Sequence, residues 1–293
     1  MQPVTPLDEV REWLAAQVRH SVVGPDEHAA ARQAELFDAP GERWFTDDSP
    51  IRRVHADSAM FVGGLRALLL QSLHPHAMAG VAQHSDYRHD PWGRLQRTAD
   101  FLAATTFGPI AEAELVIARV RAVHERVTGV ADDGRPYRAD DPHLLEWVHV
   151  VEVDSFLTAN RRHGAVPLDD AEADEYVAQM AVIARALGIA EPPRSVRELR
   201  DRIRVYRPEL RGTPAARSAA RYLLVQPPLH PLARPAYGVL AAAAVAMLPR
   251  WARAPLRLPW LPVTEFVAVR PAGQAVTAGL RWALRSGPGP APR

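Results

Sequence analysis

Histidines and arginines gather in one stretch of the chain, and their side chains are the ones there that could do chemistry. Four of the twelve histidines lie in this stretch: His74, His76, His84 and His89. Three polar positions follow at helical spacing: Arg94, Arg97 and Thr98. Imidazole is the commonest protein metal ligand and exchanges protons near neutral pH. Because these residues lie on segments that otherwise indicate buried helix, they predict a metal or a metal-bearing cofactor.

A further histidine, His149, ends the sequence EWVH in a later apolar segment. Leu145 and Val153 lie one turn from it, which places His149 close to the buried face of a helix. The residues alone allow two interpretations: a hydrogen-bonded core histidine, or an axial ligand to haem iron on a rigid helix. In the second case Glu146 or Glu152 could orient the ring through its other nitrogen.

The polar residues of the earlier helix also allow two interpretations. Arg94 and Thr98 share one helix face, and Arg97 is adjacent to it. Apolar neighbours indicate that this helix is at least half buried, and a buried arginine needs an anionic partner. The partner could be a nearby aspartate, or it could be a carboxylate-bearing ligand such as a haem propionate.

Capping explains part of the histidine cluster without any metal. His74 and His76 flank a proline at a helix start, and His84 stands near a helix end. EWVH also has the Glu-x-x-His spacing of di-iron bundles, but it occurs once, so a di-iron site is the weaker metal interpretation. A non-haem metal site remains an alternative, built from His74, His76, His84 and Glu146.

Composition excludes several classes of function. The 293 residues carry a net charge of +1 and no basic tail, so nucleic acid is not an expected partner. Cysteine is absent, and every basic residue other than histidine is arginine, which excludes thiolate metal sites and lysine chemistry. The amino-terminal segment has no apolar signal-peptide core, which favours a cytoplasmic location. The apolar run Tyr237–Leu248 is about half of a membrane span, so a core helix is expected, with peripheral membrane contact left open.

The elements that must position these groups are helical almost throughout. We expect a single all-α domain over residues 1–286, with a disordered tail at 287–293. Asp133-Gly134 predicts one short β-hairpin near 129–140. The predicted helices are Leu7–Val18, Asp26–Phe37, Asp57–Leu73, Trp92–Thr106, Ile110–Val127, Pro142–Asn160, Asp169–Leu187, Val196–Tyr206, Pro214–Val225, Leu232–Leu248 and Pro262–Leu284.

Three segments together resemble a known family. They are WFTDDSPIRRVHADSAMFVGGLRALLLQSLHPHAMAGVAQHS, DPWGRLQRTADFLAATTFG and DPHLLEWVHVVEVDSFL, which span Trp44–Leu157. These segments resemble the MpaB-type oxygenases, a group that includes the latex-clearing proteins (rubber oxygenases). The resemblance implies a helical haem b enzyme with His149 as the proximal ligand and with Arg94 and Thr98 lining the haem pocket.

The resemblance also implies a mechanism, and one residue of this chain differs from the family pattern. Dioxygen would bind on the open face of the haem, where Arg97 or His84 would hydrogen-bond it, and Arg94 would pair with a propionate. Arg97 stands where latex-clearing proteins have a lysine, and arginine stays protonated. This departure favours a small, apolar, alkene-containing substrate, such as a terpenoid, over rubber. The competing hypothesis is a haem-binding protein without turnover, in which His76 or His84 supplies a second ligand. An electron donor and the oligomeric state are left open.

Overall fold

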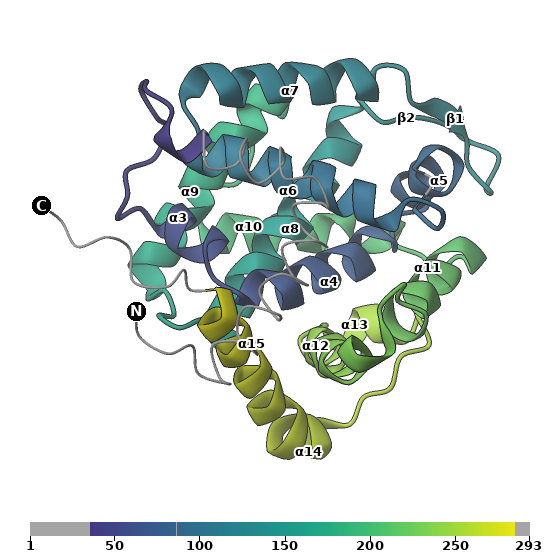
Figure 1. Cartoon of the computed structure of the whole chain (residues 1–293). Helices are drawn as coiled ribbons and strands as arrows, with labels where there is room; N and C mark the ends of the chain where they lie inside the picture. The colour runs from purple at the N-terminus through teal and green to yellow at the C-terminus, as the bar shows by residue number, and fades with distance from the viewer. Residues whose placement is uncertain (1–35, 86, 285–293) are drawn as a thin grey trace, which may run out of the picture.

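The structure is a computed structural model that describes residues 36–85 and 87–284, and helices dominate it (Figure 1). The longer helices are α4 (Ala59–Gln71), α5 (Pro75–His84), α6 (Pro91–Phe107), α7 (Ile110–His124), α8 (Pro142–His163), α9 (Asp170–Leu187), α10 (Val196–Tyr206), α11 (Pro214–Val225), α12 (Arg234–Ala246) and α15 (Arg270–Leu284). Shorter pieces are α3 (Pro50–His55), η1 (Arg207–Glu209), η2 (Pro231–Ala233), α13 (Arg250–Arg253) and α14 (Pro262–Thr264). The predicted all-α fold is confirmed.

Local sequence sets many of the helix boundaries. Proline occupies the first turn of α6 and α8, where its missing N–H costs nothing, and an aspartate caps each helix: Asp90 accepts from Gly93 N, and Asp141 accepts from His143 N. At α9 the side chain of Asp169 and that of Glu172 form a reciprocal capping box. The helix then ends at Gly188, whose φ of 109° is a left-handed conformation that favours glycine.

Helices α4 and α8 form the central pair of the molecule. They approach closely at Gly63, where an added Cβ would lie 2.9 Å from Phe156 Cδ1 and 3.2 Å from Ala159 Cβ. The buried guanidinium of Arg66 joins the two helices, because it donates to Asp154 Oδ2 and Ser155 Oγ, each at 2.7 Å. It also donates to Met247 O at the end of α12, so one satisfied buried cation ties three helices together.

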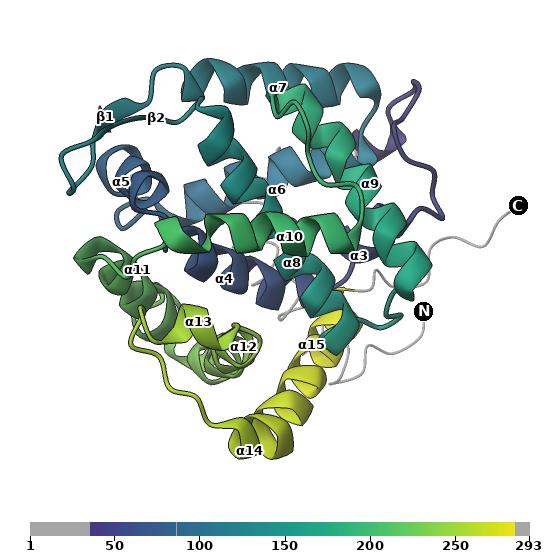
Figure 2. The same cartoon turned by 180° about the vertical axis from the view of Figure 1, so that it is seen from behind.

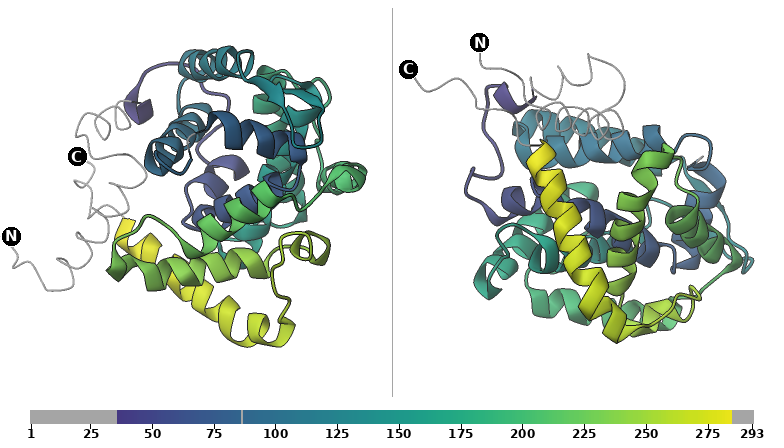
Figure 3. Two further views of the ribbon diagram at one scale, coloured as in Figure 1. Left: turned by 90° about the vertical axis from the view of Figure 1, so that its right-hand side faces the viewer. Right: turned by 60° about the horizontal axis from the view of Figure 1, so that its bottom comes forward.

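The other helices surround this pair. Helix α6 and α10 lie on opposite sides of it, as the front and back views show (Figures 1 and 2). Helix α7 packs on α6 at one end of the molecule, while α12 and α15 cross beneath α4 at the other end (Figure 3). The main core lies between α4, α8, α9 and α10, with Leu69, Trp147, Tyr176, Leu199 and Tyr206 fully buried.

The predicted hairpin is confirmed as β1 (Thr128–Val130) and β2 (Pro136–Arg138), which pair antiparallel with Gly129 opposite Tyr137. It packs beside α5. Gly134 in its turn has a φ of 79°.

One predicted helix is not continuous. Instead of a single helix over Pro262–Leu284, the chain forms α14, then a π-helical turn η3 (Glu265–Val269), then α15. Pro271 explains the break, because its ring and missing N–H do not fit a regular α-helical ladder. The predicted helix Leu7–Val18, most of Asp26–Phe37 and the tail at 287–293 lie outside the described residues.

Candidate functional site

His149 lies in the middle of the central helix α8 with only 8% of its surface exposed. Its Nε2 is buried and has no hydrogen-bond partner within the described residues. Burial lowers the pKa of His149 to about 4, so the ring is neutral at neutral pH. A buried polar atom without a partner costs free energy, which a bound ligand would recover. Among the described residues, His149 is therefore a buried, neutral imidazole whose Nε2 has no partner.

The two glutamates near His149 differ in their surroundings. The carboxylate of Glu146 accepts a hydrogen bond from Tyr206 Oη at 2.8 Å and pairs with Arg202 at 3.1 Å, so these partners, rather than the His149 ring, occupy it. Burial raises the pKa of Glu152, one turn after His149, to about 7. Glu152 is thus poised to exchange a proton near neutral pH.

Helix α6 carries the predicted arginine and threonine positions. The Arg94 side chain is half-buried, and burial, followed by repulsion from Arg97, lowers its pKa. Within residues 36–85 and 87–284 no carboxylate forms an ion pair with Arg94. Arg97 is exposed and pairs with Asp90 at 3.2 Å, and the Thr98 hydroxyl donates to Arg94 O at 3.1 Å.

On helix α4, Gly64 has no close neighbour on the side where a side chain would point. A Cβ added at Gly64 would meet no atom within 4 Å, in contrast to the tight fit at the preceding Gly63. Met60, one turn before Gly64, is partly buried against the main core, as are Phe101 and Leu102 of α6. The two neighbouring glycines of α4 therefore differ, since Gly63 meets α8 closely and Gly64 has room for a side chain.

The structure keeps His74 and His76 side by side, with ring centroids 5.6 Å apart, and places His84 against the hairpin. His84 lies at the exposed end of α5, where its Nε2 contacts Thr128 O of the hairpin at 3.1 Å. His76 Nε2 lies 3.5 Å from Asp133 Oδ2 in the hairpin turn. His74 is the buried member, 3% exposed, at the position that caps α5. The proposed catalytic and cofactor-binding roles of His76, His84, Arg97 and Thr98 stay predictions.

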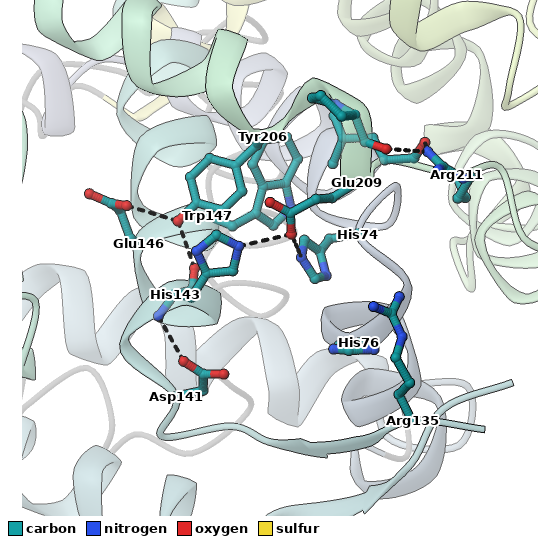
Figure 4. Close-up of polar contacts among 12 residues, drawn as sticks. His74, His76, Arg135, Asp141, His143, Glu146, Trp147, Tyr206, Glu209 and Arg211 are labelled. Atoms are coloured by element: carbon teal, nitrogen blue, oxygen red, sulfur yellow. Dashed lines mark hydrogen bonds and ion pairs between the residues drawn. The ribbon is translucent and has the colours of Figure 1, made fainter. Parts of the chain in front are cut away.

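His74 belongs to a cluster that the sequence did not reveal, which we call the His–His–Glu cluster: His74, His143 and Glu209 (Figure 4). Their ligand atoms all lie within 4.8 Å of one another. Glu209 Oε2 is 2.8 Å from His143 Nε2 and 3.4 Å from His74 Nε2. Burial lowers the pKa of His74, although Glu209 opposes that shift. Asp141-Pro142 predicts a helix start and so places His143 in the first turn of that helix. Nothing in the sequence links Glu209 to either histidine.

Taken together, the fold and this geometry define an all-helical domain with a free buried imidazole on its central helix. Comparison with protein-family models matches residues 52–282 to the family "ER-bound oxygenase mpaB/B'/Rubber oxygenase, catalytic domain". The match covers most of the chain, and the chain belongs to this oxygenase family. The resemblance seen in the three sequence segments is thus confirmed. Neither the curated proteins nor the solved structures contain a match.

Proposed function

We propose that this protein is a haem b-dependent oxygenase in which His149 binds the iron and dioxygen oxidises a small, apolar alkene. One observation carries the proposal: the Nε2 of His149 is buried, neutral and unpartnered on the central helix. The family supports oxygenase chemistry. A neutral imidazole on a rigid helix is the usual proximal ligand of haem proteins that keep an open iron position.

Helix α6 carries groups that would suit such a cofactor. The half-buried guanidinium of Arg94 lacks a carboxylate partner among the described residues and would pair with a haem propionate. Thr98, one turn from Arg94, would add a hydroxyl to the same side of α6.

Haem, when bound, supplies dioxygen activation, and the side chains of this chain supply the rest. His149 would hold the iron through Nε2, and Arg94 would pair with a propionate. Met60, Phe101 and Leu102, which pack against the main core, would keep water away from an apolar substrate beside them. Glu152, whose pKa is about 7, can accept or release a proton at neutral pH.

Cleavage of an alkene by dioxygen balances without any reductant. The carbon–carbon double bond breaks, two carbonyl groups form, and each takes one oxygen atom. Hydroxylation would instead need two electrons and two protons from an external donor. We therefore propose cleavage as the reaction.

The proposal is tested with isotopically labelled dioxygen. Protein expressed with a haem precursor is incubated with a panel of isoprenoid alkenes, while oxygen uptake and carbonyl products are measured. We expect one labelled oxygen atom in each carbonyl fragment and uptake without an added donor. Haem-loaded protein that consumes no oxygen with any alkene would favour the non-catalytic haem-binding alternative. A protein that binds no haem would favour a non-haem metal site.

We further propose contact with an anionic lipid surface through a face near the carboxyl end. Five exposed apolar side chains gather around α14 and η3: Trp260, Leu261, Val263, Phe266 and Val267. The adjoining cleft, of about 460 Å³, contains Arg162, Arg250 and Arg270, which form no ion pair with a carboxylate among the described residues. Basic and apolar groups side by side suit a lipid interface. No helix of the described residues has the length and apolar character of a membrane span.

A further inference from the structure

The His–His–Glu cluster stands apart from His149 and from the arginine and threonine of α6. Its ligand atoms come from three separate elements: His74 precedes α5, His143 lies in the first turn of α8, and Glu209 ends η1. Figure 4 shows the two imidazoles converging on the Glu209 carboxylate. Two nitrogens and one carboxylate oxygen form a donor set that suits a borderline metal ion.

We propose that His74, His143 and Glu209 bind a zinc ion, as a site separate from the haem that the proposed function requires. Zn²⁺ takes imidazole nitrogens and carboxylate oxygens at about 2.0–2.2 Å, and a set of three protein ligands leaves one position for water. The Glu209 oxygen already lies 2.8 Å and 3.4 Å from the two imidazole nitrogens. Neighbouring ligands of a tetrahedral ion with these bond lengths are about 3.3 Å apart, so the 3.4 Å separation already fits and the 2.8 Å hydrogen bond of His143 would lengthen on binding.

The second observation that points to a ligand is the state of His74. Its side chain is 4% exposed, Nδ1 has no hydrogen-bond partner within the described residues, and Nε2 has only the long 3.4 Å contact with Glu209 Oε2. An imidazole that is withdrawn from water, with one nitrogen unpartnered and the other only weakly paired, costs free energy. A metal ion between His74 and Glu209 would satisfy one nitrogen directly and would compensate that cost.

Contacts with neighbouring residues fix the positions of the three proposed ligands in the metal-free protein. Tyr206 Oη donates to His143 O at 2.8 Å, and its ring lies 4.5 Å from the His143 ring. Arg211 N donates to Leu73 O at 2.7 Å, which fixes the segment after Glu209 against the residue before His74. Such outer contacts orient metal ligands and raise affinity.

Water can reach the remaining position. The side chains of His143 and Glu209 are 47% and 41% exposed, whereas His74 forms the buried floor. His76 lies beside the cluster, with ring centroids of His74 and His76 5.6 Å apart, while its Nε2 faces Asp133 Oδ2 of the hairpin at 3.5 Å.

The experiment measures zinc in the full-length protein purified with its haem. The protein is stripped with a chelator, titrated with Zn²⁺ alone against a competing indicator, and analysed for zinc and iron separately. We expect one zinc per chain. His143→Ala and Glu209→Ala should each weaken zinc binding at least about tenfold. Their matched controls, His230→Ala and Glu114→Ala, change exposed residues elsewhere and should leave the affinity unchanged.

Zinc-edge X-ray absorption provides a second readout that iron does not disturb. We expect nitrogen and oxygen neighbours with the outer scattering of two imidazoles, and of one imidazole in His143→Ala. A wild-type protein that retains no zinc, or variants that bind it as tightly as wild type, would overturn the assignment. Because iron and zinc are counted separately, loss of the haem proposal would leave this result intact, and the reverse also holds.

Discussion

At the scale of single residues, the buried histidines make stability depend on pH. Burial lowers the pKa of His55 to about 3 and that of His163 to about 4, the latter with repulsion from Arg162, Arg270 and Arg281. The unfolded chain, with a histidine pKa of about 6.5, binds more protons than the folded chain below that pH. Each histidine therefore contributes stability that is complete above pH ~6.5 and is lost as the pH falls toward the folded pKa.

We predict that the free energy of unfolding drops by roughly 1–2 kcal/mol per buried histidine between pH 7.5 and pH 5. Urea unfolding at several pH values measures this change. His163→Gln should flatten the slope by as much as one proton, about 1.4 kcal/mol per pH unit. His230→Gln, which changes an exposed ring, should leave the slope as it is. Equal slopes for wild type and His163→Gln would show that His163 is not held neutral by burial.

At the scale of the elements, two adjacent glycines on α4 should respond oppositely to alanine. Gly63→Ala places a Cβ 2.9 Å from Phe156, so the α4–α8 contact must widen at a cost of about 1–3 kcal/mol. Gly64→Ala meets nothing within 4 Å and should gain up to ~1 kcal/mol from helix propensity. Denaturant midpoints of the two haem-free variants measure the difference. Destabilisation of similar size in both would contradict the packing described at Gly63.

The sequence predicted these elements well where caps and periodicity act locally. The Asp-Pro starts of α6 and α8, the acidic start of α9 and the Asp133-Gly134 turn each appear where expected. The break at η3 was missed, because the helical periodicity continues through Pro271 even though its backbone cannot.

The candidate site was predicted only in part, because much of it depends on tertiary contacts. His149 and Arg94 could be proposed from helix periodicity and from the resemblance. Glu209 could not, because it meets His74 and His143 only after α10 has packed on α8. The same packing brings Tyr206 and Arg202 of α10 to the carboxylate of Glu146. Helical spacing in the sequence does not predict these partners.

At the scale of the whole molecule, the apolar face around α14 and η3 should bind anionic vesicles. We predict that the protein sediments with vesicles of phosphatidylcholine containing phosphatidylserine at low salt, and much less with phosphatidylcholine alone. Phe266→Ser and Arg270→Ala should each reduce the bound fraction severalfold. Leu115→Ser, on α7 at the opposite end of the molecule (Figure 1), is the matched control. Equal binding by Phe266→Ser and Leu115→Ser would place the contact elsewhere.

The role of His149 is tested most directly by the haem content of the purified protein. The absorption spectrum and a pyridine haemochrome assay are recorded for wild type, His149→Ala, His149→Gly with added imidazole, and His163→Gln. His163 is the matched control, since it lies on the same helix, is also buried and has an unpartnered Nδ1 among the described residues. We predict about one haem per chain in wild type and His163→Gln, loss in His149→Ala, and recovery when imidazole is supplied to His149→Gly. Full haem content with an unchanged Soret band in His149→Ala would contradict the assignment of His149 as the iron ligand.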